Sequence, residues 1–436
     1  MTEIIRNLAI QSLVHGGRGL GHHDGKAVFV PLTAPGDRVD CRVVNAKRRF
    51  IEAELAEVID PSPLRRTAPC PFFGSCGGCQ WQHLPYPLQT HWKERIFADL
   101  LVRSKLVAED RLRPITAAPD EWHYRNRVQF KCHHAGTGLA LGFYRHGSHF
   151  VVDVDECRLV SPHIRVIFEL LRNELPAAPC ADCIPQVDVA CGDDGQVRII
   201  LHVLPKGRAQ LRPWLQRFAG SHGINACMQS GRKDTLEVVH GAGDLSVTVD
   251  QPRLVLHYGP GGFVQVNSPQ NRSMVATMLD LLALEGTENV LDLFCGMGNF
   301  SLPLARRAGR VTGVEDYAPS IASARSNAAA NNIHNVEFHA ADAGAVMARY
   351  RAGELDVAVL DPPRSGHYQA VSELLKICPQ RILYVSCDPA TLARDLAPLV
   401  HGGYKVVSSQ PFDLFPQTWH IESVTLLSRA AVDKPR

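Results

Sequence analysis

The sequence predicts a multidomain α/β protein. Its parts are a small OB-like N-terminal β-barrel over residues 1–60, a mixed β central domain over 61–260, and a Rossmann-like C-terminal domain over 261–436. A chain of 436 residues is too long for one ordinary hydrophobic core. Short alternating apolar runs between Gly and Pro clusters fill the N-terminal part, whereas apolar strands alternate regularly with helices after Gly261.

The overall composition is that of a globular enzyme. Hydrophobic residues make up 45% of the chain and charged residues 21%, which excludes collagen, coiled coil and wholesale disorder. The 46 Lys and Arg against 44 Asp and Glu leave a formal charge of +2, so any basic surface must be local. No apolar run approaches the ~20 residues that span a bilayer, and Gly16 and Gly17 interrupt the N-terminus before a signal peptide could form. Thirteen cysteines without an export signal favour a reducing compartment, so we expect a cytoplasmic protein.

Residues 1–60 are expected to form the small barrel. Alternating runs at 27–32, 37–44 and 50–59 predict short strands, and Gly-rich turns separate them. The segment Asp60-Pro-Ser-Pro63 has the composition of a rigid linker. Because no cofactor motif precedes this linker, we expect the barrel to be separable from cofactor binding.

A cysteine-rich knot follows the linker. Three thiols lie within ten residues at 70–79, a pattern typical of metal or cluster ligation in a reducing compartment. The fourth ligand decides between two sites. A zinc site would use the CxxC pairs Cys76/Cys79 and Cys180/Cys183 but would leave one thiol of the knot unused. An iron–sulfur cluster is therefore favoured. Its ligands would be Cys70, Cys76, Cys79 and Cys157.

The central part continues with a helix and several strands. A helical pattern occupies 91–106, with an apolar face that we expect to pack on the C-terminal domain. The segment His123-Tyr-Arg-Asn-Arg127 interleaves aromatic and basic residues, which suits either an exposed strand or contacts with a nucleic acid. Strands are expected at 127–133, 149–155, 196–204 and 245–250.

The C-terminal part predicts a doubly wound, mostly parallel sheet, whose ligands bind at the carboxyl ends of the strands. The glycine turn at 295–299 closes the first strand and opens a helix, where the backbone can approach a ligand closely. Glu315 ends the second strand and could accept hydrogen bonds from ribose hydroxyls. Asp342 ends the third strand, and Asp361-Pro-Pro ends the fourth. Strands are expected at 288–294, 311–316, 336–342, 356–363 and 381–389.

A reactive thiol is expected at the same edge of the sheet. Cys387, in Ser386-Cys-Asp-Pro389, lies at a strand-to-helix turn, where a helix N-terminus favours the nucleophilic thiolate. Glu422, in His420-Ile-Glu-Ser423, lies near the start of the last strand and by itself would pass for an ordinary strand-end acid.

Four motifs in order resemble the class I RNA uracil-carbon-5 methyltransferase family, which uses S-adenosylmethionine. They are Gly262-Phe-Val-Gln-Val-Asn267, Asp361-Pro-Pro-Arg-Ser-Gly366, Ser386-Cys-Asp-Pro389 and His420-Ile-Glu-Ser423. The resemblance implies Cys387 as nucleophile and Glu422 as general base. Around the cofactor it implies Gln265, Phe294, Asn299, Glu315, Asp342 and Asp361. Gln417 and Trp419 depart from the family, which usually has His and Gly there.

The same resemblance extends to the N-terminal half. The spacing of the cysteines is similar to that of the ribosomal branch of the family, which carries a [4Fe-4S] cluster. The barrel resembles a TRAM domain, an RNA-binding fold. The order of these parts implies 23S rRNA as the substrate, with a uridine in tRNA or at another rRNA site as the alternative.

Two other functions stay open from the residues. Asp361-Pro-Pro is also a signature of exocyclic-amine methylation, although Arg364 follows where that chemistry wants an aromatic residue. The chain could also be a non-catalytic iron–sulfur RNA-binding module. A nucleophilic Cys387 and an intact Glu422 argue against both alternatives.

Overall fold

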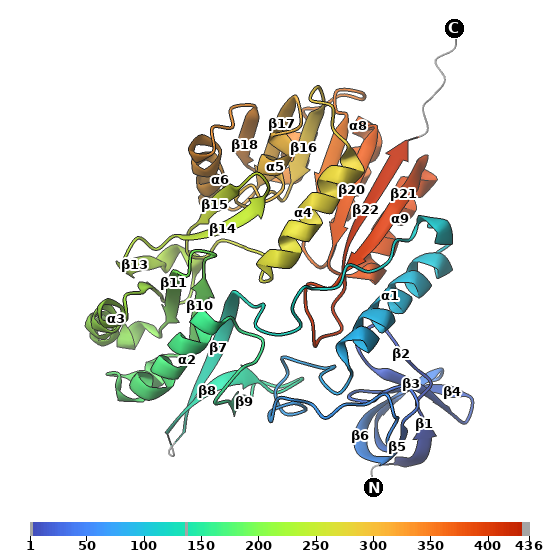
Figure 1. Cartoon of the computed structure of the whole chain (residues 1–436), viewed down its shortest axis with the longest axis vertical. Helices are drawn as coiled ribbons and strands as arrows, with labels where there is room; N and C mark the ends of the chain where they lie inside the picture. Colours follow the sequence, from blue (N-terminus) through green and yellow to red (C-terminus); the bar gives the residue numbers. More distant parts are fainter. Residues whose placement is uncertain (1–2, 136–137, 430–436) are drawn as a thin grey trace.

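The computed structural model describes residues 3–135 and 138–429. The described residues form a six-stranded N-terminal sheet, a seven-stranded central sheet, a two-stranded hairpin and a seven-stranded C-terminal sheet, and the chain passes through them in that order (Figure 1). Among the helices of the described residues, none is long and apolar enough to cross a membrane.

A six-stranded sheet forms the N-terminal part. Its strands are β1 (Ile4–Ala9), β2 (Ser12–Leu13), β3 (Gly19–His23), β4 (Lys26–Val30), β5 (Arg38–Ala46) and β6 (Phe50–Asp60). The strand order is β1-β5-β6-β4-β3-β2. The sheet curls so far that a Cβ on Gly21 would lie 2.6 Å from the carbonyl oxygen of Ala9, at the end of β1. Within the described residues the strand pairing leaves β1 and β2 as edges, so backbone pairing does not close the expected OB-like barrel.

The central part has a seven-stranded mixed sheet with α2 (Pro162–Glu174) and α3 (Arg208–His222) packed on it. The sheet order is β13-β12-β11-β10-β7-β8-β9. Its strands are β7 (Arg127–Ala135), β8 (Gly138–Tyr144), β9 (Val151–Asp153), β10 (Gln186–Cys191), β11 (Val197–His202), β12 (Asn225–Gln229) and β13 (Glu237–His240). Short 3₁₀ helices span Glu109–Arg111, Leu175–Ala177, Ala181–Cys183, Pro205–Gly207 and Lys233–Thr235.

The C-terminal part is the doubly wound sheet that the sequence predicts, in the order β18-β17-β16-β19-β20-β22-β21. The first five strands are parallel to their neighbours, and β22 runs antiparallel to β20 and β21. The strands are β16 (Asn289–Leu293), β17 (Arg310–Glu315), β18 (Val336–Ala340), β19 (Val357–Leu360), β20 (Arg381–Ser386), β21 (Tyr404–Phe412) and β22 (Glu422–Arg429). The hairpin β14 (Leu245–Asp250) and β15 (Leu254–Tyr258) shares a hydrophobic core with this sheet.

Helices cover both faces of this sheet because its side chains alternate. Val357 and Val359 pack with α4 (Ser268–Leu282), α5 (Ser301–Ala305) and α6 (Ala318–Ala330). Ala358 and Leu360 instead pack with the helices of the other face. Those helices are α1 (Tyr86–Arg103), α7 (Ala343–Met347), α8 (Tyr368–Ile377) and α9 (Pro389–His401).

The helix α1 joins the N-terminal half to the C-terminal domain. It begins at Tyr86, five residues before the expected start, because Pro87 in its first turn starts a helix well. Its buried Lys93 donates a hydrogen bond of 2.6 Å to the carboxylate of Asp413, and both side chains are fully buried. Leu13 and Ala34 of the N-terminal part belong to the same hydrophobic core as α1. The N-terminal sheet therefore docks on the rest of the chain rather than standing apart on its linker.

Candidate active site

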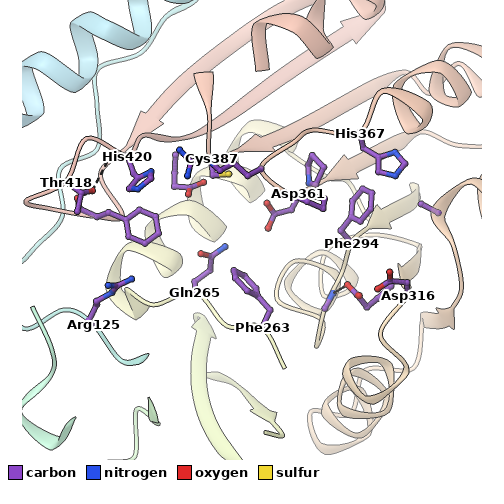
Figure 2. Close-up of a pocket in the computed structure, with 18 of the residues that line it drawn as sticks. Arg125, Phe263, Gln265, Phe294, Asp316, Asp361, His367, Cys387, Thr418 and His420 are labelled. Carbon is purple, nitrogen blue, oxygen red and sulfur yellow. Dashed lines mark hydrogen bonds between the residues drawn. The ribbon is translucent and has the colours of Figure 1, made fainter. Parts of the chain in front are cut away.

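A cavity of about 740 Å³ opens at the carboxyl ends of the parallel strands, where the sequence predicts the ligand site. Ends of β16, β17, β19 and β20 line one side, and the loop from Phe415 to Glu422 lines another. The cysteine loop contributes Gly77 and Gly78. Figure 2 shows Cys387, Asp361 and His420 facing this cavity.

The strand register brings Cys387 and Glu422 together. β20 and β22 are antiparallel, and Ser386 pairs with Ser423. Cys387 follows Ser386 at the end of β20, and Glu422 precedes Ser423 at the start of β22. The two residues therefore occupy facing backbone positions. Both line the cavity. Two motifs that lie 35 residues apart in the sequence thus form one site.

The surroundings of Cys387 raise the pKa of its thiol, whereas its place at a helix N-terminus led us to expect a lowered one. Burial and then the neighbouring carboxylates of Glu422 and Asp361 raise its pKa to about 12. The helix dipole does not offset this, because α9 begins only at Pro389 and Asp388 is its N-cap. Asp388 accepts hydrogen bonds from the backbone N–H groups of Ala390 and Thr391, so the carboxylate occupies the position that a thiolate would use.

Two acids beside the thiol have pKa values raised into the neutral range. Burial raises the pKa of Asp361 to about 7. Burial, followed by the negative charge of Asp361, raises the pKa of Glu422 to about 8. Pairs of groups with such shifted pKa values are typical of sites that transfer protons.

We expect Glu422→Gln to stabilise the protein at alkaline pH. Between the usual pKa of 4.5 and the folded value of about 8, the folded protein holds a proton that the unfolded chain has lost. Stability from this group therefore falls as the pH rises through that window. The variant removes this loss and should melt about 2–4 °C higher than wild type near pH 9, with little change near pH 5. Thermal denaturation followed by circular dichroism measures the difference.

The matched control is Glu57→Gln, because Glu57 is exposed on β6. Its melting temperature should follow that of wild type at both pH values. An equal stabilisation by Glu422→Gln at acidic and alkaline pH would show that the ionisation of Glu422 does not strain the fold.

The expected cofactor residues lie at the other end of the cavity. Glu315 ends β17 and accepts hydrogen bonds from the backbone N–H of Gly296 at 3.3 Å and of Tyr317 at 3.0 Å, which orients its carboxylate. Phe294 follows β16 with a φ of +66° and lies 5.1 Å from the ring of His367. Asp342 lines the cavity and caps α7 through the N–H of Ala345. Gln265 and Asp361 complete the lining set.

Asn299 does not line the cavity, contrary to its expected position. Its side chain exchanges two hydrogen bonds with Asn271 of α4, at 2.8 and 3.1 Å. It therefore ties the glycine turn to α4. Its amide is already satisfied by a partner that is distant in sequence, which no local pattern could reveal.

Several other residues line the cavity, although the sequence did not assign them a role in the site. They are Arg125, Phe263, Arg364, His367, Phe415, Thr418 and His420. Phe263, Arg364 and His420 lie inside the four motifs, so the motifs pointed to them without assigning a role. Arg125 lies in the basic and aromatic segment 123–127, which supports the interpretation that this segment faces a ligand.

The unusual Gln417 fixes the loop before Glu422. It is fully buried and adopts a φ of +70°. Its backbone N–H donates to the side chain of Gln89 on α1 at 2.9 Å, and its carbonyl accepts from Gln80 and Trp81. The departure from the family pattern thus leaves the loop well held.

Four cysteines of the predicted cluster line one small cavity of about 50 Å³ beside the large one. They are Cys70, Cys76, Cys79 and Cys157. Burial raises the pKa of Cys76 to about 11, and burial likewise raises those of the other three. The other walls are apolar side chains such as Phe72, Val128 and Leu159, together with the charged side chains of Arg125, Glu156 and Arg158. Four thiols that converge on one cavity are typical of a metal or cluster site.

The zinc alternative does not fit this arrangement. Cys180 and Cys183 do not line the four-thiol cavity and instead group with Asp182, their donor atoms lying within 4.8 Å of one another. Among the described residues, the sulfur atoms of the four predicted cluster cysteines do not all lie within 4.8 Å of one another. A single zinc ion, with Zn–S distances of about 2.3 Å, would hold its four sulfur ligands closer together than 4.8 Å. The two CxxC pairs therefore belong to different places in the fold.

Comparisons with known proteins identify the family of the chain. A family model described as tRNA (Uracil-5-)-methyltransferase matches residues 112–430, and a TRAM domain model matches residues 6–56. The chain is 38% identical over 434 residues to the 23S rRNA (uracil(1939)-C(5))-methyltransferase RlmD of Alkalilimnicola ehrlichii, covering 98% of this chain and 97% of the relative. The enzyme of the same name from Shewanella amazonensis is 35% identical, with 96% and 94% covered.

A solved structure has the same fold. The Pyrococcus abyssi tRNA (uracil-54, C5)-methyltransferase in complex with S-adenosyl-L-homocysteine aligns with a TM-score of 0.73, covering 97% of this chain and 100% of that one at 24% identity. The family resemblance of the four sequence motifs is confirmed by these matches. The chain belongs to the tRNA (uracil-5-)-methyltransferase family and carries a TRAM domain at its N-terminus.

Proposed function

We propose that the protein transfers a methyl group from S-adenosylmethionine to carbon 5 of one uridine in 23S rRNA. The observation that carries the proposal is the register that sets Cys387 opposite Glu422 beside Asp361 in one cavity. The 23S rRNA substrate rests on relatives with that name that align over nearly the whole chain. The thiols, which need a reducing environment, suit a cytoplasmic enzyme.

The roles of the two residues follow from the chemistry of uracil. Carbon 5 is too weak a nucleophile to take a methyl group directly. Cys387 first loses its proton to a base in the cavity, and as the thiolate it adds to carbon 6 and turns the ring into an enolate whose carbon 5 is nucleophilic. After methyl transfer, the ionised form of Glu422 takes the proton from carbon 5, the carbon–sulfur bond breaks, and the thiolate returns. A uridine in folded RNA must flip out of its stack to reach the cavity.

S-adenosylmethionine would supply an electrophilic methyl group when bound, and the lining residues fit it. Glu315 presents an oriented carboxylate suited to ribose hydroxyls, and Phe294 offers an aromatic ring beside it. Gln265, Asp342 and Asp361 complete the site, while Asn299 supports the glycine turn from behind. Among the groups that line the cavity near the glycine turn, acids predominate, which suits a cofactor without phosphates.

We also assign a [4Fe-4S] cluster to Cys70, Cys76, Cys79 and Cys157. The fit rests on four partly buried thiols that line one cavity and whose sulfur atoms do not all lie within 4.8 Å of one another, which is wider than one zinc ion needs. Thiolates are costly to bury so close together unless a cationic centre offsets their charge. Gly78 and Arg125 line both this cavity and the large one, so the cluster would support the wall of the substrate site.

Anaerobically purified protein should be brown and contain iron and sulfide. Cys157→Ser removes one of four ligands and should lose most of the iron, whereas Cys183→Ser lies outside the cavity and should keep it. Elemental analysis and the visible spectrum measure the outcome. Stoichiometric zinc without iron in the wild type would reject the cluster.

Mapping of 5-methyluridine tests the function. Mass spectrometry of 23S rRNA from a strain that lacks the gene should show one lost 5-methyluridine. The wild-type gene should restore it, and the Cys387→Ala gene should not. An unchanged 23S rRNA together with a loss in tRNA would move the substrate to tRNA. A lost methyl group on an exocyclic amine instead would favour the amine chemistry of Asp361-Pro-Pro.

A further inference from the structure

A hairpin of the TRAM domain reaches the active site. The turn between β2 and β3 places His15 beside the loop that follows Cys387. The Nε2 atom of His15 lies 3.3 Å from the carboxylate of Asp388, in a close polar contact rather than an aligned hydrogen bond. The ring of His15 also meets Trp419 edge-on, with centroids 5.1 Å apart.

The neighbouring glycine fixes this approach. Gly17 has a φ of +79°, and a Cβ at this position would lie 2.8 Å from the Cβ of Trp419. Its carbonyl accepts a hydrogen bond of 3.0 Å from the indole N–H of Trp81, which is fully buried. The hairpin is thus held tightly from two sides, and only glycine permits so close an approach.

The two side chains that His15 contacts, those of Asp388 and Trp419, both adjoin residues that line the catalytic cavity. Asp388 directly follows Cys387 and caps α9, so it sets the turn that carries the thiol. Trp419 stacks on His420 with centroids 4.3 Å apart, and Arg364 lies over Trp419 at 5.1 Å. His420 and Arg364 both line the cavity.

We propose that His15 is a positioning residue for the methyl transfer, holding Asp388 and Trp419 so that the TRAM domain sets the geometry around Cys387. The proposal rests on the proposed function of Cys387. Burial opposes ionisation of Asp388, but the contact with His15 and the N–H groups of α9 outweigh it and hold its pKa at about 2. His15 therefore faces a permanent carboxylate.

This role changes what the TRAM domain does. The linker led us to expect a separable RNA-binding barrel. Instead, its hairpin forms part of the support of the catalytic turn, so loss of the domain should slow the chemistry as well as weaken RNA binding.

The test follows covalent adduct formation with 23S rRNA transcribed from 5-fluorouridine triphosphate, at saturating RNA and S-adenosylmethionine. His15→Ala should slow adduct formation about 10- to 100-fold, because a shift of about 1 Å in a reacting group costs that much. Its melting temperature and its affinity for S-adenosylmethionine should stay near wild type. His15→Gln, which keeps a polar donor, should recover part of the rate.

The pairwise design separates positioning from folding. Asp388→Asn should slow the step similarly, and the double variant with His15→Ala should be no slower than the worse single variant. His22→Ala is the matched control, since His22 is exposed on the same sheet and its ring forms a hydrogen bond with Gln11, away from Asp388. Its rate should equal that of wild type.

Two results would overturn the proposal. One is an unchanged rate at saturation with weaker RNA binding alone, which would leave the TRAM domain a binding module. The other is a double variant whose losses multiply, which would show that His15 and Asp388 act independently. A wild-type protein that forms no adduct would instead refute nucleophilic catalysis by Cys387, so the two failures are distinguishable.

Discussion

Cys387→Ala is expected to abolish methyl transfer and covalent adduct formation while leaving the binding of S-adenosylmethionine and RNA intact. The ring is never activated without the thiol, so turnover should fall by at least about 10⁴-fold, as for other covalent nucleophiles. Glu422→Gln should fail differently: it still adds the thiol, but the carbon-5 proton stays. An RNA–protein adduct, stable in denaturing gels, should accumulate with Glu422→Gln and be absent with Cys387→Ala.

The control for the thiol is Cys378→Ala, because Cys378 lies at the end of α8 outside the cavity and its thiol donates to the carbonyl of Leu375. It should turn over as wild type does. Wild type should be trapped by 5-fluorouridine, since fluorine cannot leave as a cation. Near-normal turnover of Cys387→Ala would rule out nucleophilic catalysis, and Asp361 would become the residue to test.

Lys93→Met is expected to produce the largest loss of stability. It leaves the fully buried carboxylate of Asp413 without its cation, and one oxygen of that carboxylate already has no hydrogen-bond partner among the described residues. Leaving one charge of such a pair uncompensated costs about 3–5 kcal/mol. Lys93 also donates to the carbonyl of Phe415, so the loop before Glu422 should loosen and activity should fall. Denaturant unfolding and turnover measure both effects.

The double variant Lys93→Met with Asp413→Asn removes the uncompensated charge and should regain most of the lost stability, because a neutral pair needs no ion partner. Arg103→Met, at the exposed end of α1, is the matched control and should change stability by less than about 0.5 kcal/mol. A double variant as unstable as the single one would show that Lys93 contributes through packing rather than through charge.

Local patterns determined the architecture of the C-terminal domain. Its five parallel strands fall within a few residues of the expected ranges, because apolar residues repeat with the period of the element. The acids Glu315 and Asp361 line the cavity at the carboxyl ends of their strands, as expected. Their positions could be predicted because the apolar run of each strand shows where that strand ends. The position of α1 was less exact, because its start depends on a proline in the first turn.

Contacts between distant segments decided the rest. The register of β20 against β22 sets Cys387 opposite Glu422. Burial, and then the nearby Glu422, raise the pKa of this thiol. Its position before a helix had led us to expect a thiolate instead. Asn299 turned to Asn271 rather than to the cavity. The TRAM hairpin reached Asp388 although its linker suggested independence. Desolvation, charge and close packing at these points depend on residues far apart in the chain, so only the folded structure could determine them.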